Sequence, residues 1–78
     1  MLHNYQRLIK YLSDYLTLHK EPPSAQAIKE IFRDPEERCV IIQMTGFCRN
    51  EIPDSEYETI ACHVGQLRKG TLFKGLIS

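Results

Sequence analysis

Three helix-start signals divide this chain of 78 residues, and they constrain its fold more than any other feature. They are the segments Pro22-Pro23-Ser24, Asp34-Pro35-Glu36-Glu37 and Pro53-Asp54-Ser55. In each segment an oxygen-bearing side chain can accept hydrogen bonds from the N–H groups of a helical first turn. The neighbouring proline costs no helical hydrogen bond at that position. Together with an amphipathic opening segment, these signals predict four helical pieces.

The opening segment places apolar residues at helical spacing. It predicts a helix from Asn4 to His19, which ends there because Pro22 and Pro23 disfavour helical backbone before them. Its predicted buried stripe consists of Tyr5, Leu8, Ile9, Leu12, Tyr15 and Leu16, widened by Tyr11 and Leu18. Ser24 then predicts a second helix from Ala25 to Arg33, with Ile28, Ile31 and Phe32 buried.

The third segment is ambiguous between a helix and a strand, because 38–44 is rich in β-branched residues. Asp34 as cap and Glu37 as the reciprocal acid of a capping box favour a helix through about Phe47, unless Gly46 ends it early. The expected face of this helix consists of Val40, Met44, Phe47 and Cys48.

The last helix is expected to begin at a cap formed by Asp54 or Ser55 and to end at Gly70. Its predicted buried stripe is Tyr57, Ile60, Ala61, Val64 and Leu67. Residues 71–77 predict a short strand or a docked tail. The expected fold is therefore mainly α: residues 1–78 form a single domain, a small bundle of about four helices with a helix-turn-helix-like arrangement and a short C-terminal strand or tail.

Composition limits the classes of function. Ten basic residues balance ten acidic ones, which disfavours a histone-like nucleic-acid binder. The three cysteines are an odd number, and the first residues lack the apolar run of a signal peptide, so we expect a reducing cytoplasm and mostly buried thiols. The longest apolar run, residues 39–42, is too short to cross a membrane. A core this small is marginal, and a homodimer is therefore expected.

No motif predicts catalysis, a metal or a cofactor. The cysteines lie nine and fourteen residues apart, unlike the closely spaced pairs of a structural zinc site. Cys62 and His63 are adjacent, and neighbouring helical side chains diverge, which disfavours both a shared metal and a nucleophile–base pair. We therefore expect a protein that is not an enzyme.

The outer face of the last helix carries compact polar side chains, including Cys62, opposite the apolar stripe. Thr59, His63 and Gln66 are residue types that reach base edges in the major groove. Arg68, Lys69 and Lys74 are candidates for phosphate contacts. Glu56 and Glu58 oppose this interpretation, because the start of a recognition helix usually faces the DNA.

The segment from Leu12 to Phe32 resembles the start of LexA-type winged-helix DNA-binding domains. In that family an amphipathic first helix leads into a turn and then Pro-Pro-Ser or Pro-Pro-Thr, matched here by Pro22, Pro23 and Ser24, with the following hydrophobic residue at Ile28. The resemblance implies a small transcriptional regulator. The recognition helix would be 55–69, and residues 70–77 would form a truncated wing.

Two hypotheses of function follow. The first is a small, dimeric transcriptional regulator that binds double-stranded DNA through a helix-turn-helix-like core. The second is a compact helical module, such as an adaptor, anti-activator or inhibitor, that binds a regulatory protein and not DNA. Its expected surface is Tyr11, exposed beside Arg7 and Lys10, or an apolar patch that includes Leu72 and Phe73.

Overall fold

The computed structural model describes residues 2–68, and these residues form four α-helices, one 3₁₀ turn and no strand. The elements are α1 (Leu2–Leu18), α2 (Ala25–Arg33), α3 (Pro35–Thr45), the 3₁₀ turn η1 (Arg49–Glu51) and α4 (Glu56–Arg68). The mainly helical fold class is thus confirmed, and the segment that was ambiguous between helix and strand is helical. The predicted strand or tail at 71–77 lies outside the described residues.

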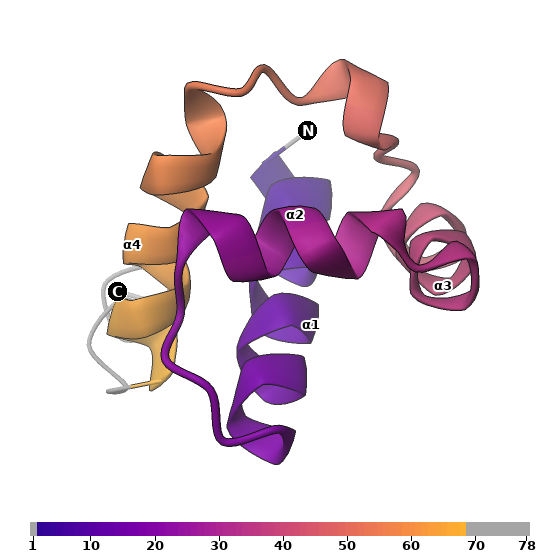
Figure 1. Ribbon diagram of the computed structural model, residues 1–78. Helices are drawn as coiled ribbons and strands as arrows, with labels where there is room; N and C mark the ends of the chain where they lie inside the picture. Colours follow the sequence, from indigo (N-terminus) through magenta and orange to yellow (C-terminus); the bar gives the residue numbers. More distant parts are fainter. Residues whose placement is uncertain (1, 69–78) are drawn as a thin grey trace.

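Two helices, α1 and α2, cross each other, and the other two flank them (Figure 1). α1 and α2 each pack against both α3 and α4, so that the last two helices close opposite sides of the bundle. In Figure 1, α2 crosses in front of α1, with α4 on the left and α3 on the right. The predicted span of α2 is confirmed at both ends, and α1 begins and ends within two residues of its predicted limits.

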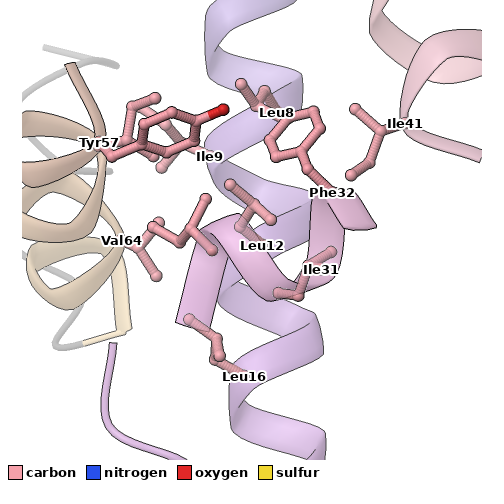
Figure 2. Packing of buried hydrophobic residues seen from close by; sticks show 11 residues of the cluster. Leu8, Ile9, Leu12, Leu16, Ile31, Phe32, Ile41, Tyr57 and Val64 are labelled. Atoms are coloured by element: carbon pink, nitrogen blue, oxygen red, sulfur yellow. The ribbon is translucent and has the colours of Figure 1, made fainter. Parts of the chain in front are cut away.

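The core lies where these four helices meet. α1 contributes the largest share, and its central residues Leu8, Leu12 and Leu16 are fully buried. Figure 2 shows Phe32 projecting from α2 toward Leu8 of α1, with Ile41 of α3 beyond it. The predicted buried residues of α2 are all confirmed. On α4, buried Tyr57, Ile60 and Val64 and the half-buried Ala61 and Leu67 confirm the predicted stripe.

The end of α1 is a Schellman motif. The Glu21 N–H donates to the Leu16 carbonyl at 3.1 Å, and the Lys20 N–H donates to the Thr17 carbonyl at 3.2 Å. Lys20 takes the left-handed conformation, with φ at 57°, at the position where glycine is the usual residue. The chain therefore turns at the expected place, but at a cost in backbone strain.

α2 and α3 are separated by one residue, Asp34. Ser24 begins α2 by accepting the Ala27 N–H at 3.1 Å, and the Asp34 carboxylate accepts the N–H groups of Glu36 and Glu37 at the start of α3. Both predicted caps are therefore confirmed. The capping box is not formed, because the Glu37 carboxylate instead accepts the Tyr11 hydroxyl of α1.

The buried face of α3 differs from the prediction. Ile41 and Thr45 point inward, whereas Val40 is 39% exposed and Met44, Phe47 and Cys48 are only half-buried. Gly46, in the left-handed conformation with φ at 80°, ends the helix, as in the earlier of the two predicted endings. The Thr45 hydroxyl donates to the Ile41 carbonyl at 2.7 Å and accepts the Phe47 N–H at 3.1 Å, which satisfies this buried polar group.

The connector before α4 contains η1, which the sequence analysis did not predict. The Glu51 carboxylate accepts the Cys48 N–H at 2.8 Å and holds this short turn. α4 begins without the expected side-chain cap. Backbone carbonyls serve its first turn instead: Pro53 accepts the Glu56 N–H at 2.9 Å, and Asp54 accepts the Tyr57 N–H at 3.3 Å.

Candidate functional site

A row of aromatic side chains runs along α1 toward its C-terminal end. Tyr11, Tyr15 and His19 are spaced four residues apart, so their side chains lie above one another on one face. The ring centroids of Tyr11 and Tyr15 are 6.4 Å apart, and those of Tyr15 and His19 are 4.2 Å apart, each pair tilted by 31°. These contacts hold each ring against its neighbour and form one wall of an apolar surface.

This row lines a groove of about 320 Å³, here called the α1 groove. Its lining residues come mainly from α1, with one acid from α3, and they are Tyr11, Asp14, Tyr15, Leu18, His19 and Glu37. The hydrogen bond from Tyr11 to Glu37 joins the two helices at the groove. Asp14 forms an exposed ion pair with Lys10 at 3.4 Å, which contributes little stability.

Leu18 is the most exposed large apolar residue among those that the structure describes. Its exposed fraction is 77%, although the sequence analysis placed it at the edge of the buried stripe. Tyr11, which was expected to be exposed, is half-buried, and its hydroxyl is bound to Glu37. Covering a leucine with a partner would contribute roughly 1.5–3 kcal/mol. The groove therefore combines an exposed aliphatic side chain with aromatic rings that pack against one another.

The residues predicted to read DNA do not share one environment. Thr59, Cys62 and Gln66 are exposed on α4, as expected, and the Gln66 amide lies 3.7 Å from the Cys62 sulfur. His63 is half-buried, and its ring meets the Tyr5 ring edge-on, with centroids 5.9 Å apart at 88°. His63 thus packs against α1 and is not fully presented on the outer face.

Arg68 is the predicted phosphate-binding residue that the structure describes. Its guanidinium donates to the Glu21 carbonyl at 3.0 Å, which ties the end of α4 to the turn after α1. The other two, Lys69 and Lys74, lie outside the described residues, as do Leu72 and Phe73 of the predicted apolar patch.

The cysteines are less buried than predicted. Cys39 is exposed and Cys48 is half-buried, whereas the exposure of Cys62 agrees with its predicted place on the outer face of α4; all three are free thiols. Within residues 2–68, no three His, Cys, Asp or Glu side chains gather closely enough to hold a metal ion. In the same part of the chain, no helix has both the length and the apolar character needed to cross a bilayer.

Most of the α1 groove was not predicted from the sequence. Tyr15 was expected in the core, and no role in binding was predicted for Asp14, His19 or Glu37. The spacing of Tyr11, Tyr15 and His19 was the available signal. In comparisons with known proteins, no family model, no curated protein and no solved structure matches the chain.

Proposed function

We propose that this protein is a small helical interaction module that binds another protein through the α1 groove. The observation that carries the proposal is Leu18, which is 77% exposed and lines the groove together with the packed rings of Tyr15 and His19. Tyrosine is enriched among the residues that dominate binding energy at protein interfaces, and the exposed leucine beside it adds apolar surface that a partner can cover. A regulatory protein that inserts an apolar side chain beside Leu18 would bury this surface.

The shape of the groove also suits a protein segment. It is open and shallow, and it extends along the final turns of α1, where an amphipathic helix can place apolar residues at regular spacing. Two carboxylates, Asp14 and Glu37, also line the groove, and each can accept a hydrogen bond from a partner. The free thiols, two of them exposed, fit a protein that works in the reducing cytoplasm.

DNA binding through α4 is the second candidate, supported by the exposed side chains of Thr59 and Gln66. The acidic residues of α4 disfavour DNA binding. Glu56 and Glu58 stand in the first turn of α4, where they would meet the phosphates that a recognition helix approaches. Arg68 is already bound to the Glu21 carbonyl. For these reasons we rank the protein-binding function first.

A paired capture experiment tests the proposal. The wild-type protein and a Leu18→Ser variant are immobilised, and the proteins retained from a lysate of the source cells are compared by mass spectrometry. Because Leu18 is exposed, its replacement should leave folding intact while weakening a specific partner roughly tenfold or more. Ile42→Ser is the matched control, since Ile42 is also an exposed aliphatic residue but does not line the groove.

A protein retained by the wild type and by Ile42→Ser, and lost with Leu18→Ser, is the expected result. Retention of the same proteins by all three would contradict the proposal. Light scattering on the purified chain identifies the case in which the partner is a second copy, because Leu18→Ser would then convert a dimer to a monomer.

A further inference from the structure

A second, separate surface lies at the other end of the bundle. Here η1, the start of α4 and the first half of α1 enclose a cleft of about 220 Å³, which we call the η1 cleft. Its floor is apolar and consists of Leu8, Phe47, Ile52 and Ile60. The volume is below the roughly 300–1,000 Å³ of typical small-molecule sites, and it suits a single apolar side chain.

Two carboxylates, Glu51 and Glu56, stand at the edge of this cleft. Both residues are exposed, and within residues 2–68 neither forms an ion pair. Glu51 is oriented by the Cys48 N–H, which it accepts through one oxygen, so that its other oxygen can accept from a partner. The two acids are therefore placed beside the apolar floor without an ion-pair partner among residues 2–68.

The surroundings of the cleft are acidic as well. Asp54 and Glu58 are exposed close by in the sequence, and the one base in the stretch 49–58 is Arg49. Arg49 lies near the phenol of Tyr57, where its charge opposes the rise in the pKa of that group. At Tyr5, which lines the cleft, burial raises the phenol pKa and the charge of Glu56 raises it further. The effect of Glu56 on Tyr5 indicates a negative potential on the Tyr5 side of the cleft.

We infer that the η1 cleft binds a cationic protein segment that inserts one apolar side chain between flanking lysines or arginines. The apolar floor takes the side chain, and Glu51 and Glu56 pair with the bases on either side. Charge complementarity selects this occupant, since an anionic membrane surface or a nucleic acid would be repelled by the same carboxylates. The inference is independent of the α1 groove, with which this cleft shares no lining residue.

The test uses a short synthetic peptide in which a tryptophan stands between two lysines. The chain itself contains no tryptophan, so the fluorescence of the peptide reports binding without interference. We expect a saturable blue shift at low salt that weakens as salt is added. Two control peptides should not bind. In the first, glutamates replace the lysines; in the second, serine replaces the tryptophan between the lysines, and a tryptophan far from them serves as the reporter.

Variants of the protein locate the site. Glu51→Gln keeps an acceptor for the Cys48 N–H, and we expect it and Glu56→Gln each to weaken binding about threefold to fivefold. Glu58→Gln is the matched control: it removes the same charge from an exposed residue of α4 that does not line the cleft. Leu18→Ser, which alters the α1 groove, should leave peptide affinity unchanged.

The inference would be overturned if the wild type did not bind the peptide at low salt, or if Glu51→Gln and Glu56→Gln bound it as tightly as the wild type does. It would also be overturned if Glu58→Gln weakened binding as much as those two variants do. Loss of binding on Leu18→Ser would also overturn it, because the peptide would then occupy the α1 groove. Leu18→Ser distinguishes the two surfaces, because it alters only the α1 groove. A negative result for the η1 cleft therefore does not contradict the proposed function of the α1 groove, and the reverse also holds.

Discussion

The hydroxyl of Tyr11 on α1 donates a hydrogen bond to the carboxylate of Glu37 on α3. The two residues are 26 positions apart, and their contact joins the helices at the edge of the α1 groove. It also explains why Glu37 does not complete a capping box, since its carboxylate points to α1 and not back to Asp34. The pair therefore couples the packing of α3 to the shape of the proposed binding surface.

Removing this hydrogen bond should lower stability. We expect Tyr11→Phe to reduce the free energy of unfolding by about 1–2 kcal/mol, because the acceptor is charged and the bond is partly buried. A double-mutant cycle with Glu37→Gln, measured by urea denaturation, isolates the interaction. Additive effects of the two substitutions would show that the pair contributes no coupling.

Replacing Lys20 should raise stability. A side chain other than glycine in the left-handed conformation costs about 1 kcal/mol, and Lys20→Gly relieves this strain. The expected gain is about 1 kcal/mol in the free energy of unfolding. Lys20→Ala is the control, because it removes the charge and retains the Cβ atom. If alanine stabilises the protein as much as glycine does, the gain comes from charge and not from the backbone.

Alkaline pH should destabilise the protein through Tyr57. Burial raises the pKa of this phenol above its ordinary value of 10.0. In the unfolded chain the phenol ionises first, so its contribution to stability is fully present below about pH 10 and is lost as the pH rises through the folded-state pKa. Urea denaturation across this range should show a steeper loss in the wild type than in Tyr57→Phe.

At neutral pH, Tyr57→Phe should not reduce the stability of the protein. Among the described residues the buried Tyr57 hydroxyl has no hydrogen bond of good geometry, although Arg49 lies close enough to lower its pKa, so its removal should be neutral or stabilise the fold by up to about 1 kcal/mol. A marked loss of stability in Tyr57→Phe would show instead that the hydroxyl is satisfied in solution.

Duplex DNA offers a direct contrast with the protein-binding proposal. We expect no salt-dependent binding of random duplex DNA at about 50 mM salt, a condition under which non-specific phosphate contacts register strongly. Fluorescence anisotropy is the measurement, with Thr59→Ala and Gln66→Ala as probes of α4. Saturable binding that falls with salt and weakens in these variants would favour the DNA-binding hypothesis.

The ends of α2 could be predicted from the sequence, because capping residues determine them. α2 could be bounded correctly because Ser24 and Asp34 act on the backbone beside them. The orientation of α3 could not, because Val40, Ile41 and Ile42 are consecutive apolar residues that define no single face. Packing against α1 and α2 selects Ile41, and its neighbours remain partly exposed.

The candidate site depends even more on packing between distant segments. The sequence contains the four-residue spacing of Tyr11, Tyr15 and His19, but it does not reveal that Glu37 of α3 lies beside them. Likewise, the sequence does not reveal that the Arg68 guanidinium donates a hydrogen bond to the Glu21 carbonyl. Such contacts join residues far apart in the chain, which periodicity and capping rules do not address.

The most direct test of the account is to map the bound surface by nuclear magnetic resonance. The ¹⁵N-labelled protein is titrated with the partner recovered by capture, and the amide shifts are assigned to residues. If the partner occupies the α1 groove, the largest shifts fall on Tyr15, Leu18 and His19, and Leu18→Ser abolishes them. Shifts that centre on Thr59 and Gln66, and that persist in the Leu18 variant, would contradict the central claim.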